Sequence, residues 1–365
     1  MDRSRAVISI PHSAFINAIA TAVPSHDVHR SFIDWAEARV TDRRQRALFR
    51  RMTDRAGIVH RWSVLPPTSG GGSPVSAGGL YEGASPLTSE RMRIYAEAAP
   101  ALALETIAKL SKRASLAKVT HLVVASCTGF VAPGIDQIIA RTLRLDVGVE
   151  RTLIGFMGCY AAISALRTAH HIVRSEPGAR VLVVTVELST LHLQYSSEIE
   201  ALLAMLQFGD GAAAAIVTAE PEGFAISRPF AAALSHTGEL IRWTIGDTGF
   251  AMHLSGEVAG RIATALQDAA VRERIFGAVQ IGEIDSWAVH AGGRSILDAV
   301  ERSLALPGDA LEASREVLSS FGNMSSSTLM FVLAALLDQP ERRKGIALAF
   351  GPGLAAEGFH FARAS

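Results

Sequence analysis

The chain has 365 residues, 49% of them hydrophobic, which is enough apolar material for one large domain or two fused halves. Its 35 basic and 35 acidic residues give a formal net charge of zero, so no overall field favours nucleic acid or an anionic membrane as a partner. The two cysteines are too few for a disulfide framework and too far apart for a CxxC site, which favours a reducing, cytoplasmic compartment; no metal-ligand spacing is present.

The N-terminal segment does not resemble a signal peptide, because its apolar pieces are short and are interrupted by Pro11, His12 and Asn17. The sequence contains no uninterrupted run of about 18 apolar residues, so no membrane-spanning helix is expected. The first element is expected to be a strand within residues 5–23.

Residues 27–57 carry a helical pattern rich in charged side chains that ends near Gly57. Its second half is dense in arginine: Arg43, Arg44, Arg46, Arg50, Arg51 and Arg55. These arginines form either an ordinary solvated helix face or a binding site for the anionic part of a cofactor. Residues 66–86, rich in glycine, proline and serine, are predicted to be a surface loop.

From residue 90 onward, helical patterns alternate with apolar runs, which is typical of parallel strands joined by helices. An alanine-rich helix is expected over 90–113. The strands expected after it lie at 121–125, 152–154 and 180–186, with helices at 134–145 and 159–174 between them. Residues 209–217 indicate a tight turn that feeds a buried strand.

The second half repeats this organisation more loosely. Strands are predicted at 286–289 and 345–350, and helices at 293–304, 312–319 and 325–337. The halves are alike in organisation but not in residues, so a duplicated architecture is a hypothesis.

Cys159 follows an apolar run and a glycine and precedes a helical pattern. At the first turn of a helix, unpaired backbone N–H groups and the positive end of the dipole favour a thiolate, which makes Cys159 a candidate nucleophile. Gly155 and Gly158 are expected to let the backbone turn sharply and leave the sulfur reachable. The alternative is a small buried apolar residue, the commoner fate of an intracellular cysteine.

Two further stretches place polar residues at junctions between elements. His290 ends a strand-like run beside two glycines, where a hydrogen-bonded core histidine is the ordinary alternative to a catalyst. Asn323 lies in a glycine- and serine-rich stretch that would ordinarily be a helix N-cap cluster. Ligands of open α/β sheets bind beyond the carboxyl ends of strands, and all three stretches fall at such junctions.

Five separated motifs occur in order along nearly the whole chain: Gly158-Cys159-Tyr-Ala-Ala, Phe208-Gly-Asp-Gly-Ala212, His290-Ala-Gly-Gly293, Gly322-Asn-Met-Ser325 and Gly351-Pro-Gly353. Together they resemble the type III polyketide synthases, the chalcone-synthase-like members of the thiolase fold. The resemblance implies an α/β fold of five αβαβα layers, with two similar halves around mixed sheets. The halves would span residues 1–222 and 223–365, and the enzyme would usually be a homodimer.

The resemblance also implies a catalytic triad, with Cys159 as nucleophile, His290 as its partner and Asn323 as a second hydrogen-bond donor. The Cys159 thiolate would attack a starter acyl thioester and hold the acyl group. His290 and Asn323 would stabilise the negative charge that develops on a malonyl thioester as carbon dioxide leaves, and the carbanion would attack the bound acyl group. The implied substrates are acyl-CoA and malonyl-CoA, with no metal or redox cofactor.

Two gatekeeper positions follow from the same resemblance. Phe208 matches an aromatic residue between the substrate tunnel and the initiation pocket, with plain core as the alternative. The second gatekeeper, aromatic in the plant enzymes, falls on Met252. Because methionine is narrower and more adaptable than phenylalanine, a flexible aliphatic starter of medium or long chain is expected.

Further family positions concern the shape of the substrate cavity. Cys127 and Ser325 match pocket positions, with Cys127 as a small residue that tunes the cavity. Ser189 and His192 resemble positions that line the cyclisation cavity, where His192 is either a proton relay for ring closure or a surface histidine. Ala132 replaces a larger residue that, in the plant relatives, reaches across the dimer.

Arg51 and Arg55 resemble basic positions that hold the phosphates of coenzyme A, for which guanidinium groups are suited by charge and geometry. The expected product is an alkylpyrone or an alkylresorcinol type of molecule. Three alternatives stay open at this point: a ketoacyl synthase that condenses once, a catalytically silent acyl-binding subunit, and a cysteine hydrolase that transfers the acyl group to water.

Overall fold

The computed structural model describes residues 13–83 and 85–364. The strands of its main sheet in the first half of the chain are β1 (Ala14–Ala22), β4 (His121–Ser126), β5 (Glu150–Gly155), β6 (Val181–Leu188) and β7 (Asp210–Thr218). Those in the second half are β8 (Phe224–Ala233), β11 (Ser286–Val289), β12 (Lys344–Gly351) and β13 (Ala355–Arg363). They hydrogen-bond in the order β11-β12-β13-β8-β1-β7-β6-β4-β5, so β8 and β1 join the two halves.

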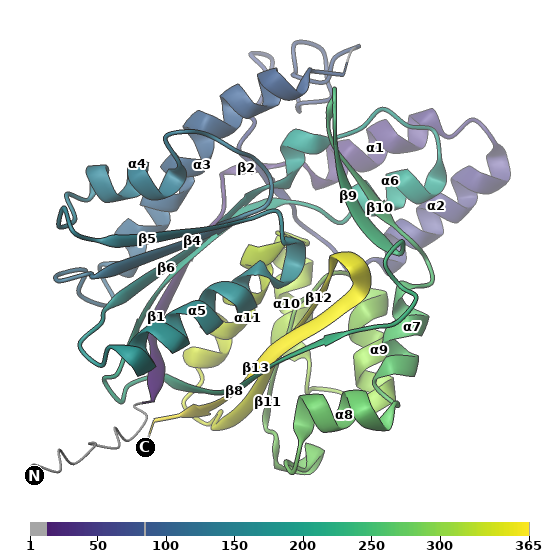
Figure 1. Ribbon diagram of the computed structural model, residues 1–365. Helices are drawn as coiled ribbons and strands as arrows, with labels where there is room; N and C mark the ends of the chain where they lie inside the picture. The colour runs from purple at the N-terminus through teal and green to yellow at the C-terminus, as the bar shows by residue number, and fades with distance from the viewer. Residues whose placement is uncertain (1–12, 84, 365) are drawn as a thin grey trace, which may run out of the picture.

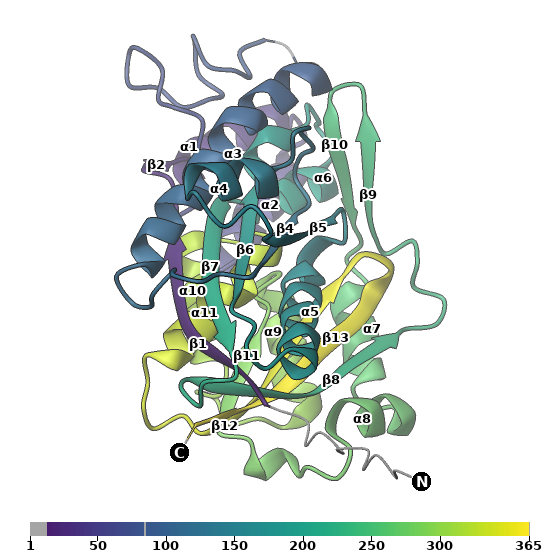
Figure 2. The same ribbon diagram turned by 60° about the vertical axis from the view of Figure 1, so that its left-hand side comes forward.

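The helices of the first half are α1 (His29–Arg39), α2 (Arg43–Arg55), α3 (Thr88–Leu110), α4 (Ile135–Thr142), α5 (Ala161–Ser175) and α6 (Ile199–Met205). The second half contributes α7 (Val258–Ala265), α8 (Ala269–Phe276), α9 (Arg294–Leu304), α10 (Glu312–Phe321) and α11 (Ser326–Leu337). Two small two-stranded sheets stand outside the main sheet: β2 (His26–Asp27) with β3 (Trp62–Ser63), and the hairpin of β9 (Ile241–Gly246) with β10 (Gly249–Leu254). Figure 2 shows β9 and β10 apart from the main sheet.

Alternation along the strands assigns side chains to separate cores. On β4, Val123 and Ala125 join the central core around α5 and α11, whereas Leu122 and Val124 join the core beneath α3. Strand β12 alternates in the same way between the central core and the core beneath α9. Because both halves of the sheet pack against α5 and α11, the expected five αβαβα layers are confirmed (Figure 1).

The run Ala212–Ala215 on β7 explains how closely these layers approach. Alternate alanines belong to the central core and to the core beneath α3, and all are fully buried. Small side chains on both faces of a strand let a helix pack close on each side, and α3 and α11 both contact β7.

Most of the predicted elements are present. The predicted helices and strands between 90 and 350 coincide with observed elements to within a few residues, and β4 is parallel to both β5 and β6. The strand expected at 5–23 is β1, although residues 5–12 lie outside the described part of the chain. The pattern did not predict α6, α7, α8 or the antiparallel strands β8, β9, β10 and β13.

The segment predicted as a surface loop needs a correction. Its described residues form no helix or strand, as expected, but Ser73, Pro74 and Tyr81 are buried. The Tyr81 hydroxyl donates to the Thr190 carbonyl at 2.8 Å, so this loop packs against the main body of the protein.

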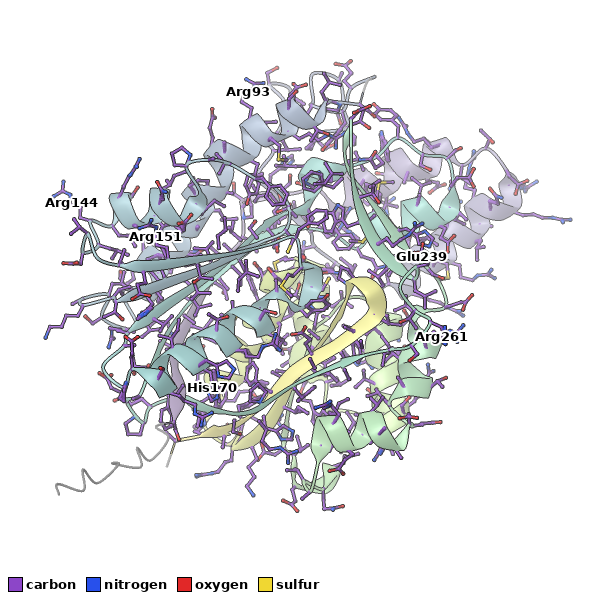
Figure 3. The ribbon with its side chains drawn as sticks, in the orientation of Figure 1. Arg93, Arg144, Arg151, His170, Glu239 and Arg261 are labelled. Atoms are coloured by element: carbon purple, nitrogen blue, oxygen red, sulfur yellow. The ribbon has the colours of Figure 1, made fainter. Side chains whose placement is uncertain are left out.

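Charged groups of both signs lie around the periphery, as Arg93, Arg144, Arg151, Glu239 and Arg261 illustrate (Figure 3). This distribution agrees with the zero net charge. Among the described residues, none of the helices has the length and apolarity needed to cross a membrane.

Candidate active site

Cys159 lies in the turn η1 (Gly158–Tyr160), between edge strand β5 and helix α5. The backbone enters the left-handed region at Phe156 (φ 55°) and Gly158 (φ 76°), and this reverses the chain ahead of α5. Gly155, expected to share this task, does not have a positive φ. The turn therefore depends on Gly158 and on a phenylalanine held in an uncommon conformation.

Gly158 is required by packing as well as by conformation. A Cβ at this position would lie 2.4 Å from Cδ of Pro352. The Tyr160 hydroxyl donates to the Pro352 carbonyl at 3.3 Å, and a Cβ on Gly351 would lie 2.5 Å from the Tyr160 ring. The Gly-Cys-Tyr and Gly-Pro-Gly motifs are thus two sides of one contact.

His290 follows β11, where its backbone N–H donates to the Leu348 carbonyl at 2.8 Å and continues the pairing with β12. Its side chain is buried, and neither ring nitrogen has a hydrogen-bond partner among the described residues. A Cβ on Gly292 would lie 3.2 Å from the His290 ring, so glycine leaves room for the imidazole. The alternative of a hydrogen-bonded core histidine does not describe this side chain.

Asn323 lies in the loop between α10 and α11. Its backbone pairs with the chain at Phe208: Asn323 N–H donates to Gln207, and Gly209 N–H donates to Asn323, at 2.7 and 3.0 Å. Its side-chain Oδ1 accepts from Ser325 N–H at 2.8 Å, while Nδ2 donates to the Gly292 carbonyl at 3.2 Å. These contacts fix the amide orientation and leave one Nδ2 hydrogen for a ligand.

Cys159, His290 and Asn323 line one small cavity. Burial, with a contribution from the negative charge of Glu187, raises the pKa of Cys159 to about 12. The Ser325 hydroxyl and the Asn323 amide lower this pKa in part. Burial lowers the pKa of His290 to about 3. Burial thus opposes the thiolate that the helix terminus was expected to favour. A Cys159 thiolate alone and a His290 imidazolium alone are both costly in this buried site.

A second, larger and largely apolar cavity adjoins the first. Phe208, Trp243 and Met252 line both cavities, so they stand between the catalytic residues and the larger space. The two predicted gatekeepers are therefore brought together. Sequence reasoning missed Trp243, because a tryptophan on a short strand outside the motifs carries no local signal of its position.

Ser189 and His192 both line the larger cavity, in the turn η2 (Ser189–His192) that follows β6. His192 contacts the Thr128 carbonyl through Nε2 at 2.7 Å and accepts from Phe250 N–H through Nδ1 at 3.0 Å. Its ring also stacks on Phe250, with ring centroids 4.1 Å apart. Both nitrogens are occupied by backbone groups, so His192 is neither a proton relay nor a surface histidine, and both interpretations are corrected.

The other three residues predicted to line the substrate pocket lie elsewhere. Cys127, Ser325 and Ala132 are absent from the residues that line the two cavities. The buried Cys127 sulfur instead accepts from Gly158 N–H at 3.0 Å, behind the nucleophile turn. Ser325 is buried near Cys159, whose pKa it lowers, and Ala132 is exposed. Cys127 and Ser325 thus support the nucleophile from behind and do not form a wall for the ligand.

Arg51 and Arg55 lie on the exposed side of α2, whose buried residues are Phe49 and Thr53. They share a shallow surface hollow with Arg43, Arg46, Ala47, Arg50 and Asp54. Five of the six arginines singled out in the sequence therefore line this hollow, and Arg44 does not. Among residues 13–83 and 85–364, no group of three or more histidine, cysteine or acidic side chains could hold a metal ion.

The two halves of the chain match two family models, for the N-terminal domain of chalcone and stilbene synthases over residues 2–221 and for their C-terminal domain over residues 229–363. The chain therefore belongs to the chalcone and stilbene synthase family. This is the family of type III polyketide synthases, acyltransferases that carry out decarboxylative condensation with malonyl-CoA. The resemblance inferred from the five motifs is confirmed.

Individual relatives agree with this assignment. The chain is 32% identical over 364 residues to the alpha-pyrone synthesis polyketide synthase-like Pks18 of Mycobacterium tuberculosis, covering 95% of this chain and 91% of that protein. PKS-I from the brown alga Ectocarpus siliculosus superposes with a TM-score of 0.86 at 27% identity, over 96% of this chain and 98% of that chain. The 1,3,6,8-tetrahydroxynaphthalene synthase of Streptomyces coelicolor gives 0.86 at 24% identity over 96% and 99%, a likeness of fold.

Proposed function

We propose that this type III polyketide synthase loads an aliphatic acyl group from acyl-CoA onto Cys159, extends it repeatedly with malonyl-CoA, and cyclises the product to an alkylpyrone. The observation that carries the proposal is the shared wall of Phe208, Trp243 and Met252 between the catalytic pocket and an apolar cavity. A flexible alkyl chain bound to Cys159 can bury its methylene groups in that cavity. The pyrone is preferred over an alkylresorcinol because Pks18 is named for alpha-pyrone synthesis.

Loading begins with transfer of the Cys159 proton to the unprotonated ring nitrogen of His290, a side chain with no hydrogen-bond partner among the described residues. The two charges form together, and their mutual attraction offsets part of the burial cost that each carries alone. The thiolate then attacks the thioester carbonyl of the starter, and coenzyme A leaves as the thiol.

Extension uses the same residues in a different role. The malonyl thioester carbonyl accepts hydrogen bonds from His290 and from the second Nδ2 hydrogen of Asn323, so negative charge is stabilised as carbon dioxide leaves. An amide suits this task because it donates without giving up a proton that would quench the carbanion. The carbanion attacks the acyl group on Cys159, the thioester bond to Cys159 breaks, and the sulfur leaves as a thiolate. The chain, now two carbons longer, is a coenzyme A thioester, and its transfer back to Cys159 with release of coenzyme A permits the next extension.

Arg51 and Arg55 are proposed to bind the phosphates of the coenzyme A thioesters through the exposed face of α2. The proposed chemistry uses these thioesters as substrates and requires no metal or redox cofactor. Both cysteines are free thiols, and a nucleophilic thiol functions in a reducing compartment, so a cytoplasmic location is part of the proposal.

A homodimer is also proposed, with the second copy seated at edge strand β5. The side chains of β5 are mostly exposed, and large apolar groups gather there: Leu153 is 47% exposed, Phe156 37% and Phe130 47%. Phe130 and Phe156 lie in contact, with ring centroids 5.9 Å apart. An uncovered strand edge flanked by aromatic groups favours pairing with an identical edge.

The test is incubation with malonyl-CoA and a series of acyl-CoAs of increasing length, with mass spectrometry of the products. We expect pyrones that contain several malonyl-derived units, none of which forms with Cys159→Ala. One malonyl unit per starter would instead indicate a ketoacyl synthase. Release of free acid without carbon dioxide would indicate a hydrolase. Failure of a radiolabelled acyl-CoA to label Cys159 would indicate a silent acyl-binding subunit.

A further inference from the structure

One face of α2 combines basic and apolar side chains that are all exposed: Arg44, Leu48, Arg51, Met52 and Arg55. The helical period places these five residues on one stripe, directed away from the buried Phe49 and Thr53. We call it the α2 stripe, and at 1.5 Å per residue it is about 17 Å long. Leu48 is 37% exposed and Met52 41%, so two large apolar side chains face solvent among arginines.

The charges of the α2 stripe are not neutralised within the protein. Its three arginines form no side-chain hydrogen bond or ion pair with any other described residue. Arg50 and Arg46, which lie off the stripe, do have partners: Arg50 pairs with Glu37, and Arg46 Nε donates to the Val40 carbonyl at 2.9 Å. The whole helix contains six arginines and one acidic residue, so its exposed side favours an acidic partner.

Helix α2 borders the segments that form the catalytic pocket. It lies at the edge of the molecule next to α1 and α6 (Figure 1). Its buried Phe49 shares a core with Leu206, two residues before the gatekeeper Phe208. At the other end of the helix, the Arg55 carbonyl accepts from Arg294 Nη1 at 3.4 Å, and Arg294 begins α9 directly after the loop of the catalytic histidine. A thioester arm that enters beside α2 therefore arrives at the catalytic pocket.

Phosphate binding by Arg51 and Arg55 accounts for only part of the α2 stripe. Phosphate oxygens do not cover the aliphatic side chains of Leu48 and Met52, and Arg44 lies about 10 Å further along the helix than Arg51. A protein surface that presents carboxylates and apolar side chains complements the whole stripe. Acyl carrier proteins hold their acyl group on the same phosphopantetheine arm that coenzyme A contains. A carrier that inserts this arm beside α2 must place its own surface on the stripe.

We propose that the α2 stripe is a docking surface for an acidic acyl carrier protein that delivers the starter. The inference rests on the proposed role of Cys159 as nucleophile and extends it by naming the donor; malonyl-CoA stays the extender. In the transfer, a bond forms between the Cys159 sulfur and the acyl carbon, and the bond from that carbon to the carrier's sulfur breaks. The carrier leaves as a thiol with the proton that Cys159 gave up.

The test compares two donors that carry the same radiolabelled acyl group, a bacterial acyl carrier protein and coenzyme A. The measurement is the second-order rate constant for labelling of Cys159. Leu48→Glu and Arg44→Glu should each lower this constant for the acyl carrier by about tenfold, because the new carboxylate repels the acidic surface. Labelling from acyl-CoA should change by about twofold or less, since neither residue is among those proposed to bind its phosphates.

Leu87→Glu and Arg93→Glu are the matched controls, because they make the same changes of side chain away from α2. Leu87 is 58% exposed just ahead of α3, and Arg93 is exposed on α3 at the periphery (Figure 3). Both variants should keep the wild-type rate constants for both donors. Equal losses in the stripe variants and in these controls would overturn the inference.

Labelling of the wild type by acyl-CoA but not by the acyl carrier overturns the docking inference and leaves the proposed function intact. Unchanged carrier labelling in Leu48→Glu also overturns it. In that case, loss of binding to phosphatidylglycerol vesicles would assign the stripe to a membrane surface, and loss of the dimer in analytical ultracentrifugation would assign it to a second copy. Absence of labelling from both donors would contradict the proposed function, and the docking inference with it.

Discussion

Trp243 on β9 and Met252 on β10 are directly paired across the hairpin, and both side chains line the catalytic pocket and the apolar cavity. With Phe208, whose ring centroid lies 6.3 Å from that of Trp243, they form the passage between the two spaces. The width of this passage should set which acyl chains extend from Cys159 into the apolar cavity.

Met252→Phe should narrow the passage and shift the starter range toward shorter acyl chains. Because a rigid ring cannot move aside as methionine does, kcat/KM for long acyl-CoAs should fall by about tenfold or more, with a smaller effect on short ones. His253→Phe is the matched control, since His253 is exposed on the same strand. An unchanged starter-length profile in Met252→Phe would show that Met252 does not gate the cavity.

Asn323→Ala should separate extension from loading. Loss of one donor to the developing charge should slow malonyl-CoA decarboxylation by about a hundredfold or more, while Cys159 still takes up the starter. Carbon dioxide release and radiolabelled acyl transfer measure the two steps in the same preparation. Equal losses in both steps would mean that Asn323 supports the site as a whole.

Replacing both Arg51 and Arg55 with alanine should raise KM for malonyl-CoA by about tenfold, because two guanidinium groups no longer face the phosphates. Loading from a short acyl thioester that lacks those phosphates should change little. The double alanine variant of Arg93 and Arg144, which lie at the periphery (Figure 3), controls for loss of surface charge. Equal losses with both donors would argue against phosphate binding by α2.

Stability should decrease in mild acid because His192 is held neutral in the folded state. Its Nδ1 accepts from Phe250 N–H, and burial lowers its pKa from 6.5 to about 4. As the pH falls from about 6.5 to about 4, the unfolded chain takes up a proton that the folded chain does not, so the free energy of unfolding falls. In His192→Gln this dependence should be flatter by up to about 1.4 kcal/mol per pH unit in that window.

The measurement is urea unfolding across that pH window, with His253→Gln as the control because His253 is exposed. Glu187 and Asp210 contribute to the pH dependence of the free energy of unfolding with the opposite sign. Their raised pKa values make the folded state the better proton acceptor as the pH falls. Comparing each variant with the wild type isolates the contribution of His192. Parallel pH dependences for His192→Gln and the wild type would contradict the prediction.

Leu153→Lys should weaken the proposed dimer, because it places a charge on the exposed edge strand. Analytical ultracentrifugation should show the wild type as a dimer and the variant shifted toward monomer. Val59→Lys is the matched control, since Val59 is 58% exposed and outside β5. A monomeric wild type, or a dimer that both variants leave intact, would refute the β5 interface.

The fold could be predicted from the sequence to the extent that each element carries its own pattern. The buried strands β4 and β6 are mostly apolar runs, and helices α9 and α11 of the second half begin and end within a residue of their predicted bounds. Strands β9 and β10 could not be predicted, because the burial of their side chains follows no regular alternation and each strand pairs only with the other. Such a hairpin is stabilised by what it covers, which local patterns do not encode.

Some residues of the candidate site could likewise be identified from the sequence, and others could not. Cys159, His290 and Asn323 stand in short motifs whose glycines are needed locally, as the clash between a Gly158 side chain and Pro352 shows. The sequence motifs therefore identified Cys159, His290 and Asn323, three of the residues that line the catalytic pocket. Only the tertiary structure decided that Trp243 divides the cavities and that Cys127 lies behind the nucleophile turn, because these placements depend on which distant segments share a core. Burial then reverses the electrostatic tendency that the helix terminus alone would give Cys159.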